Sequence, residues 1–302
     1  MKDDSAKIRI LIVDDNVVNL RLLTLILGRE GFDVISTSDS LKAVALTVEH
    51  SPHLILLDIM MPGLSGLEIL QLLKLNNLTQ SVPVVMVTAR TKGQDVRAAL
   101  EAGAFDYIKK PLDEIEIVAR VHSALRYKFH QDRLVEMATH DSLTGLYNHR
   151  LLIELLEREL SVSRRKDQSV SFCMADIDHF KSLNDQFGHQ AGDYVLQEIS
   201  RLLTEGVRRS DPVGRYGGEE FGLVLGSCSP ETARNLCERL RVSVQNHPFQ
   251  ISGKEVHVTL SMGLAHAHPK ATITETELVH EADSALYRAK ESGRNRLESW
   301  GP

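Results

Sequence analysis

Five short apolar runs alternate with helix-like segments over the first 112 residues, and this alternation constrains the fold more than any other feature of the chain. Apolar strands that alternate with helices imply a parallel sheet covered by helices on both faces. We therefore predict a doubly wound α/β domain with a five-stranded parallel sheet, whose ligands bind beyond the carboxyl ends of the strands. The expected strands are residues 8–13, 33–36, 53–57, 82–87 and 105–108.

A helix-like stretch without Gly or Pro follows, from Asp113 to about His140, and it could extend roughly 40 Å. A second alternating region comes after it, and its mixed pattern predicts an α+β domain with an antiparallel sheet. Its expected elements are helices at 150–166, 191–205, 231–246 and 276–292, strands at 170–176 and 256–265, and a hairpin near 217–220. The expected domains are 1–125, a helical linker at 113–140 that continues the last helix of the first domain, and 141–302.

The composition excludes several functions. A net charge of -6 and a pI near 6.1 give the 302-residue chain no bulk attraction to nucleic acid or to an anionic membrane. The apolar run after the polar start ends at Asp14, too soon for a signal peptide or a membrane span. Cys173, Cys228 and Cys237 form no CxxC pair, so we expect reduced thiols. We therefore expect a cytoplasmic protein without nucleic-acid or membrane partners.

Polar side chains follow four of the expected strands in the first domain. Asp14 and Asp15 follow the first strand, Asp58 the third, Thr88 the fourth and Lys110 the fifth. The carboxyl ends of parallel strands meet at one edge, so these groups would lie together. Crowded carboxylates favour Mg²⁺, one of them could accept a phosphoryl group, and the hydroxyl and ammonium could hold its oxygens. Taken singly, the aspartate pair could be a helix cap, Asp58 a turn residue and Lys110 a solvated lysine.

The stretches LIVDDN, LILLDIMMPGLSG, VTA and FDYIKKP resemble the receiver domain of bacterial response regulators, a flavodoxin-like fold, over about residues 7–125. The resemblance implies that Asp58 accepts phosphate from a histidine kinase. It also implies that Asp15, Asp58 and the backbone carbonyl of Met60 hold Mg²⁺, with Asp14 assisting.

The same resemblance implies how the receiver reads phosphorylation. Thr88 and Lys110 would hold the phosphoryl group, and Tyr107 would be the aromatic side chain that changes orientation. The family's lysine directly precedes proline, so Lys110 rather than Lys109 takes this role. The peptide bond between Lys110 and Pro111 is expected to be cis.

The second domain carries a glycine pair before two glutamates, in the stretch GRYGGEEFGLVLG. Gly217 and Gly218 would let a ligand approach the backbone closely, although an ordinary hairpin tip with solvated glutamates could have the same sequence. An apolar strand delivers Asp176 elsewhere in this domain. Asp176 and Glu219 from neighbouring strands could ligate Mg²⁺ on a nucleoside triphosphate, and a nearby carboxylate could take a proton from an attacking hydroxyl.

A polar segment follows Asp176 and is expected to be irregular. It contains Asp178, Lys181, Asn184, Asp185 and Asp193. The carboxylate of Asp193 could accept from N1–H and the 2-amino group of guanine, and the amide of Asn184 could serve the remaining edge. Ordinary caps and turns would explain each of these residues separately.

Four motifs in order resemble the GGDEF domain of diguanylate cyclases, over essentially all of residues 140–300. They are DSLTGLYN, DIDHFKSLNDQFGHQAGD, RYGGEEF and ADSALYRAKESGRNR. The family condenses two GTP molecules into cyclic di-GMP and releases pyrophosphate. The motif reads GGEEF here, and the family accepts either acid. Relatives that make mixed guanine–adenine products carry serine in place of Asp193, so this carboxylate favours GTP over ATP.

This resemblance assigns roles in catalysis. Asp176, the carbonyl of Ile177 and Glu219 would bind Mg²⁺, and Glu220 would support the metals. Glu219 would be the base for the 3′-hydroxyl. Lys181 would stabilise the phosphoryl charge in the transition state.

The resemblance also assigns substrate contacts. Asn184 and Asp193 would recognise guanine. Lys290 and Arg294, four residues apart on the last helix, would grip the phosphates, although such a basic pair is often only a solvated face.

Arg208 and Asp211 form RxxD, at the spacing of the family's inhibitory product site. Arg208 can chelate a guanine edge or a phosphate, and Asp211 can pair with guanine N1–H. An exposed helix end with a local ion pair would have the same pattern. Beside the cyclase motifs, we expect inhibition by the product.

Two copies of the chain are expected to face each other, because each half-site holds one GTP and the product has two-fold symmetry. The helical linker is the expected contact, as a dimerisation coiled coil. Its apolar residues fit two interrupted heptad seams, so phosphorylation at Asp58 could bias one of two registers, or a single static helix could join the copies. One seam uses Val118, Val121, Leu125 and Val135, and the other uses Ile115, Val118, Leu125 and Phe129.

The sequence thus predicts a homodimeric diguanylate cyclase that is activated by phosphorylation and inhibited by its product. Two other interpretations stay open: a non-catalytic response regulator that binds GTP or cyclic di-GMP and signals by protein contact, and a receiver that serves mainly as a dimerisation adaptor. His266 and His268 have no assigned function and are expected to be exposed.

Overall fold

The computed structural model describes residues 7–89, 93–269 and 272–301. The chain divides into two compact units, Met1–Leu134 and Val135–Pro302. No described helix is long and apolar enough to cross a membrane.

The strands of the first unit are β1 (Arg9–Val13), β2 (Asp33–Thr37), β3 (Leu54–Asp58), β4 (Val84–Thr88) and β5 (Asp106–Lys109), and its helices are α1 (Val17–Arg29), η1 (Ser40–Lys42), α2 (Ala43–His50), α3 (Gly66–Leu75), α4 (Gly93–Glu101) and α5 (Glu114–Thr139).

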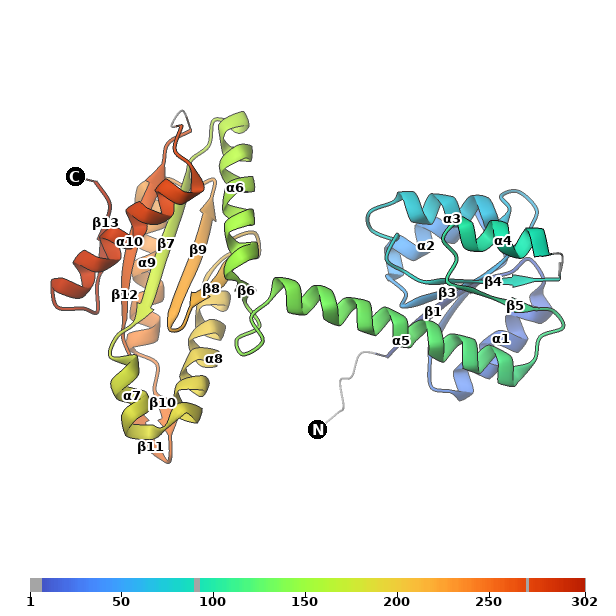
Figure 1. Ribbon diagram of the computed structural model, residues 1–302, viewed down its shortest axis with the longest axis horizontal. Coiled ribbons are helices and arrows are strands. Elements are labelled where there is room, and N and C mark those ends of the chain that lie inside the picture. The colour runs from blue at the N-terminus through green and yellow to red at the C-terminus, as the bar shows by residue number, and fades with distance from the viewer. Residues whose placement is uncertain (1–6, 90–92, 270–271, 302) are drawn as a thin grey trace. The chain divides into compact units, whose positions relative to one another are not determined.

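The first unit is the predicted doubly wound domain. Its five strands are all parallel, in the order β2-β1-β3-β4-β5. Helices α1 and α5 cover one face and α2, α3 and α4 cover the other (Figure 1). All residues of β3 and β4 are buried, which explains why these strands are continuous apolar runs.

Helix α5 begins as part of the core of the first domain. Ile117, Val121, Ala124 and Leu125 are buried against α1 and the sheet, whereas the side chains from Gln131 to Ala138 are exposed. Both predicted heptad seams are therefore wrong. Each of them uses Leu125, and one also uses Val121, but these side chains already pack inside their own domain and cannot face a second chain.

The second unit has a six-stranded sheet in the order β13-β12-β7-β9-β8-β6. Its centre is antiparallel as predicted, but β6 and β13 add parallel edges. The short hairpin of β10 and β11 was not predicted. The strands are β6 (Tyr147–Asn148), β7 (Val170–Ile177), β8 (Val213–Gly217), β9 (Glu220–Gly226), β10 (Phe249–Ile251), β11 (Lys254–Val256), β12 (Leu260–Ala267) and β13 (Leu297–Ser299), and the helices are α6 (His149–Lys166), α7 (Phe180–Phe187), α8 (His189–Gly206), α9 (Pro230–Gln245) and α10 (Glu275–Glu291).

Helices cover both faces of this second sheet. Helices α8 and α9 pack on one face, and α6 and α10 pack on the other (Figure 1). The polar segment predicted to be irregular instead forms α7 and the start of α8, separated by Gly188 at φ +84°. The hydrophobic spacing of Phe180, Leu183 and Phe187 fits one helical face, because these three side chains pack against the core.

One histidine also departs from expectation. His268 is exposed as predicted, but His266 is half-buried and its Nδ1 lies 2.7 Å from Ser171 Oγ. Burial lowers the pKa of His266, and the nearby His268 acts in the same direction. All three cysteines are free thiols, and Cys173 and Cys237 are buried.

Candidate functional sites

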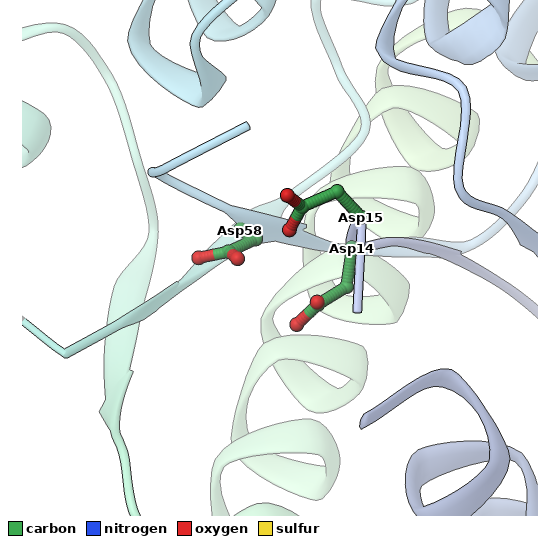
Figure 2. Close-up of side chains that lie close together, drawn as sticks. All are labelled: Asp14, Asp15 and Asp58. Carbon is green, nitrogen blue, oxygen red and sulfur yellow. The ribbon is translucent and has the colours of Figure 1, made fainter. Parts of the chain in front are cut away.

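The receiver site lies at the carboxyl edge of the parallel sheet. Asp14 follows β1, and Asp58 is the last residue of β3. One carboxylate oxygen each from Asp14, Asp15 and Asp58 lie within 4.8 Å of one another. Figure 2 shows the three side chains gathered from the ends of these two strands. The neighbouring parallel strands therefore assemble the acidic cluster as predicted.

Lys110 joins this cluster from the end of β5. Its Nζ donates to Asp14 Oδ2 at 2.9 Å and to Asp58 Oδ2 at 2.8 Å. Burial raises the pKa of Asp58; the hydrogen bond from Lys110 opposes this, and the charge of Asp14 adds to it. Burial disfavours the charged form of Lys110, but its bonds to Asp58 and Asp14 raise its pKa overall. One ammonium cannot neutralise three ionised carboxylates, and the three side chains offer oxygen atoms of the kind that bind Mg²⁺.

The backbone holds Asp58 in place. Gly66 opens α3, and a Cβ there would lie 2.1 Å from the carbonyl oxygen of Asp58. Ser65 caps this helix in a reciprocal capping box with Glu68. The start of α3 is thus fixed directly against the end of β3, and only glycine fits at this contact.

The other predicted receiver residues lie on β4, on β5 and just after β3. Thr88 ends β4 and is buried, and Tyr107 lies half-buried on β5 against the core of the α2–α4 face. The N–H of Met60 donates to Asp58 Oδ1 at 3.4 Å. The peptide bond after Lys110 is cis, as predicted.

A second group of acids lies at one end of the six-stranded sheet. Asp176 on β7 is in register with Glu220 on β9, and the N–H of Ile177 donates to the carbonyl of Glu219 at 3.3 Å. Gly218, at φ +41°, and Glu219 form the hairpin tip between β8 and β9. The sheet register therefore brings Asp176, Glu219 and Glu220 to the same end, as predicted.

Lys290 enters this second site from α10. Its Nζ lies 2.8 Å from Asp176 Oδ2. Burial raises the pKa of Asp176, and Lys290 opposes that shift. Burial, followed by repulsion from Asp176, raises the pKa of Glu219 and of Glu220. Among the described residues, only the acids of the first cluster have oxygens that all lie within 4.8 Å of one another, so the three carboxylates of the second site are spaced more widely.

Asn184 and Asp193 come from the two helices beyond β7. Asn184 Oδ1 is buried without a hydrogen-bond partner, one of two such side-chain atoms among the described residues. A Cβ on Gly192 would lie 2.0 Å from that oxygen. Asp193 beside it is exposed, and Lys181 is exposed on α7. The amide of Asn184 thus keeps an unused acceptor beside a free carboxylate, which is a suitable pair for a polar ring edge.

Arg294 does not share the last helix with Lys290, so that prediction is wrong. Helix α10 ends at Glu291, and after Ser292 the backbone turns through three residues with positive φ: +111° at Gly293, +61° at Arg294 and +46° at Asn295. Arg294 nevertheless remains close enough for its charge to oppose the raised pKa of Asp176. Lys290 and Arg294 both lie near Asp176, but a turn rather than a helix face positions the arginine.

Sequence reasoning missed a contact that holds the hairpin tip. Arg215 donates to the carbonyl of Gly218 from Nε at 2.9 Å and from Nη2 at 2.7 Å. Its Nη1 also lies 3.1 Å from Asp141 Oδ1. Both residues lie inside recognisable motifs, DSLTG and RYGGEEF, but the sequence does not show that the two motifs touch. Arg215 thus ties the tip that carries Glu219 to the turn that follows α5.

The RxxD residues form a turn after α8. The N–H of Arg208 donates to Asp211 Oδ2 at 3.3 Å, and the N–H of Asp211 donates to the Arg208 carbonyl at 2.9 Å. Burial raises the pKa of Asp211. A cavity of about 380 Å³ adjoins this turn, and Arg239 and Cys228 also line it. No ion pair joins the two RxxD side chains in the part of the chain that is described, so both can face a ligand.

The chemistry of both acid groups fits Mg²⁺. All the candidate ligands are oxygens, which is the donor type that Mg²⁺ prefers. In each site a lysine contacts a carboxylate whose pKa burial raises, because burial disfavours the charged form, and a divalent cation would favour that charged form.

Comparison with known families agrees with this architecture. The family described as "Diguanylate cyclase, GGDEF domain" matches residues 138–296, and the family described as "Response regulator receiver domain" matches residues 10–122. A receiver fold followed by a nucleotidyl-cyclase-like fold is thus matched in both parts. The chain belongs to the GGDEF family of diguanylate cyclases, with a response regulator receiver domain ahead of the GGDEF domain.

Individual relatives share both domains. The chain is 35% identical over 299 residues to the response regulator PleD of Caulobacter vibrioides, which covers 96% of this chain and 65% of PleD. The chain therefore spans slightly less than two thirds of that relative. It is 31% identical over 276 residues to diguanylate cyclase A of Treponema denticola, covering 88% of this chain and 72% of that protein.

Solved structures match the second unit. The coiled coil and GGDEF domain of DgcB from Caulobacter crescentus, in complex with c-di-GMP, aligns with a TM-score of 0.56 at 26% identity, over 62% of this chain and 98% of that chain. Diguanylate cyclase SiaD from Pseudomonas aeruginosa, solved with its activator SiaC, aligns with a TM-score of 0.52 at 37% identity, over 61% of this chain and 71% of that chain.

Proposed function

We propose that this protein is a diguanylate cyclase, activated by phosphorylation, that condenses two GTP molecules into cyclic di-GMP and two diphosphates. The convergence of Asp176, Glu219, Glu220 and Lys290 at one end of the sheet carries this proposal. Membership of the GGDEF family supports it. The acidic hairpin argues against a receptor that only binds nucleotide, because such a receptor has no need of a base.

The residues at the hairpin would act together on the attacking nucleotide. Asp176, the carbonyl of Ile177, Glu219 and Glu220 would hold Mg²⁺, which when bound neutralises charge on the triphosphate. Glu219 takes the proton from the attacking 3′-hydroxyl, and its raised pKa suits a base that works near neutral pH. Lys181 stabilises the charge that develops on the transferred phosphoryl group.

The substrate contacts follow from the two helices and the last turn. The unpartnered Oδ1 of Asn184 and the exposed carboxylate of Asp193 read the guanine edge. Lys290 and Arg294 grip the phosphates from the end of α10 and the turn beyond it. A site built to hydrogen-bond guanine discriminates against adenine, because buried polar groups would otherwise lose their partners.

The receiver supplies the activating signal. Asp58 accepts a phosphoryl group from the histidine of a kinase, and Asp14, Asp15, Asp58 and the carbonyl of Met60 would hold Mg²⁺ there. Lys110 is already within hydrogen-bond distance of Asp58 and can hold a phosphoryl oxygen.

Two further receiver residues complete this proposed switch. Thr88, at the end of β4, would hold a second phosphoryl oxygen, and Tyr107 on the adjacent strand would change orientation. Tyr107 pairs with Met86, two residues before Thr88, so a movement of Thr88 towards the phosphoryl group could reach Tyr107 through these adjacent strands.

Dimerisation is proposed to use the exposed part of α5. Tyr127, Leu134 and Met137 are 49%, 59% and 67% exposed. Tyr127 and Leu134 lie one heptad apart, and Met137 follows Leu134 by three residues, so together they offer a new seam in place of the two that the receiver core excludes. Paired helices would bring two GTP half-sites to face each other.

Cyclic di-GMP is proposed to inhibit the enzyme at the RxxD turn. Arg208 and Asp211 adjoin the cavity of about 380 Å³, and Arg239 on its wall offers a second guanidinium. Guanine presents both acceptor atoms and N–H donors along its edge. The paired N–H groups of Arg208 can donate to the acceptors, and the carboxylate of Asp211 can accept from N1–H.

The proposal is tested by incubating the purified protein with GTP and Mg²⁺, with and without beryllofluoride, and measuring cyclic di-GMP by chromatography. Product should form and beryllofluoride should increase the rate. Glu219→Gln should lose about 10³-fold in rate, whereas Glu255→Gln, an exposed glutamate on β11, should not. Binding of GTP or cyclic di-GMP without turnover would instead identify a non-catalytic response regulator.

A further inference from the structure

Asp178 is a buried carboxylate to which neither the family comparison nor the proposed reaction assigns a role. It lies one residue beyond β7 and is 8% exposed. Burying a carboxylate is costly unless it receives hydrogen bonds. Asp178 receives them from three residues in two separate segments of the chain, and this arrangement indicates what the residue does.

The first two hydrogen bonds come from β12 and the residue before it. Thr259 Oγ1 donates to Oδ2 of Asp178 at 2.6 Å, and Ser261 Oγ donates to Oδ1 at 2.6 Å. The backbone agrees with this contact, because the N–H of Asp178 donates to the Thr259 carbonyl at 3.0 Å. Asp178 thus fastens the end of β7 to the start of β12.

The third hydrogen bond comes from the turn after α10. The N–H of Asn295 donates to Asp178 Oδ2 at 3.0 Å. Asn295 and Arg294 both have positive φ, a conformation that costs energy for residues other than glycine and that persists only when its surroundings impose it. The side chain of Asn295 is held as well, by the buried Arg241.

We propose that Asp178 is a positioning residue for nucleotidyl transfer. Its carboxylate locks the turn at 293–295, so that Arg294 is presented to the same end of the sheet as Asp176 and Lys290. The inference rests on the proposed cyclase function, since Arg294 is useful there only if it meets the phosphates of GTP. Asp178 itself touches neither substrate nor metal in this role; it acts as a hydrogen-bond acceptor.

Two substitutions separate this role from a role for the charge. Asparagine at 178 can place its oxygen where Oδ2 lies, accept from Thr259 and Asn295, and donate its amide to Ser261 Oγ, because a hydroxyl can also accept. Alanine can do none of this. Asp178→Ala should therefore raise the KM for GTP by about tenfold or more with a smaller change in kcat, and Asp178→Asn should stay close to the wild type.

Stability must be separated from positioning. Thr274→Ala removes the capping box at the opposite end of α10 and should lower the melting temperature without changing KM. Kinetics are measured on the full chain, well below the melting temperature of every variant. Amide hydrogen exchange of residues 292–296 gives a readout that does not depend on turnover, and it should be faster in Asp178→Ala but not in Thr274→Ala.

The outcomes are distinct. A folded Asp178→Ala with the wild-type KM and wild-type exchange at 292–296 would overturn the proposal. So would an Asp178→Asn as impaired as Asp178→Ala, because the charge, rather than an acceptor atom, would then be required. A wild-type protein that makes no cyclic di-GMP from GTP would refute the proposed function itself, and with it the role given to Arg294.

Discussion

Each of the two acid groups of this protein combines carboxylates with one lysine, but different backbone elements position them. In the receiver, Asp14, Asp15 and Asp58 come from the ends of neighbouring parallel strands, and Lys110 bridges two of them. In the GGDEF domain, the acids come from a strand end and a hairpin tip, and Lys290 forms an ion pair with Asp176.

The two sites therefore differ in how firmly their residues are held in position before a ligand binds. The backbone of Asp58 is fixed by a contact that admits only glycine at position 66. The tip that carries Glu219 is held instead by the side chain of Arg215, and Asn184 keeps an unused acceptor. A site on rigid strand ends binds a small ion with little rearrangement, whereas a site on a turn can adapt to a large nucleotide.

The largest expected effect is that of Gly66→Ala in the receiver. The new Cβ would meet the carbonyl oxygen of Asp58, which cannot rotate away, so the receiver should lose about 3 kcal/mol or more of unfolding free energy. Circular dichroism in urea reports both domains, and fluorescence of Trp300, the single tryptophan, reports the second. Gly28→Ala on α1, where a Cβ meets nothing within 4 Å, is the matched control. Equal stability of the two variants would contradict a rigid receiver site.

The next effect compares the two lysines. Lys110→Met leaves the buried Asp14 and Asp58 without their cation and should cost about 2–3 kcal/mol. Lys290→Met removes a single, more exposed partner of Asp176 and should cost about 1 kcal/mol. Urea titrations of each variant with and without Mg²⁺ measure this, and Mg²⁺ should recover more of the loss in Lys110→Met. Equal losses of unfolding free energy in the two variants would show that the two lysines stabilise their sites to the same extent, which would contradict the comparison.

Gly192→Ala should impair binding rather than folding. Its Cβ would lie 2.0 Å from Asn184 Oδ1 and 3.0 Å from the ring of Phe180. The Asn184 amide ends a side chain that can move, and the ring needs to shift by only a few tenths of an ångström, so the domain should remain folded. The displaced amide could no longer read guanine, so the KM for GTP should rise about tenfold. Steady-state kinetics and a melting curve measure the two effects, with the exposed Gln190→Ala as control. A large fall in melting temperature would mean that this site is as rigid as the receiver.

The smallest effect is a dependence on pH at the turn that supports the hairpin. Burial would raise the pKa of Asp141, but hydrogen bonds from Thr144 and the contact with Arg215 outweigh it and lower the pKa. A lowered pKa gives stability that is complete above the unfolded value of about 3.9 and is lost as the pH falls through the folded value. Asp141→Asn should therefore cost about 1 kcal/mol or less at pH 7 and less in acid.

Urea unfolding followed by Trp300 at several pH values tests this last prediction. The difference between wild type and Asp141→Asn should shrink below about pH 4. If the difference in unfolding free energy did not change with pH, the shape of the Asp141 side chain rather than its charge would stabilise the hairpin.

The sequence predicted the fold where a pattern repeats along the chain. The buried strands β3 and β4 are uninterrupted apolar runs, so their ends and the residues that follow them could be located. The edge strands β6 and β13 are too short for any periodicity to appear. Helix α7 was not predicted because the polar residues of FKSLNDQF are typical of a loop and leave only three apolar residues at helical spacing.

The sites were predictable as sets of residues but not as contacts. Asp141 and Arg215 are 74 positions apart, and Asp178 and Asn295 are 117 apart, so no local pattern connects them. The heptad seams failed for a related reason. Periodicity shows that Leu125 is apolar, but only the packed domain shows that its own core already uses it.

The division of labour along α5 limits how this protein can be recombined with others. Because Ile117, Val121 and Leu125 complete the receiver, a chimera that joins this receiver to a different output domain must keep this chain's own sequence through Leu125. A junction placed at Glu114, where the helix begins, would deprive this receiver of part of its interior. The useful splice points therefore lie inside the helix rather than at its start.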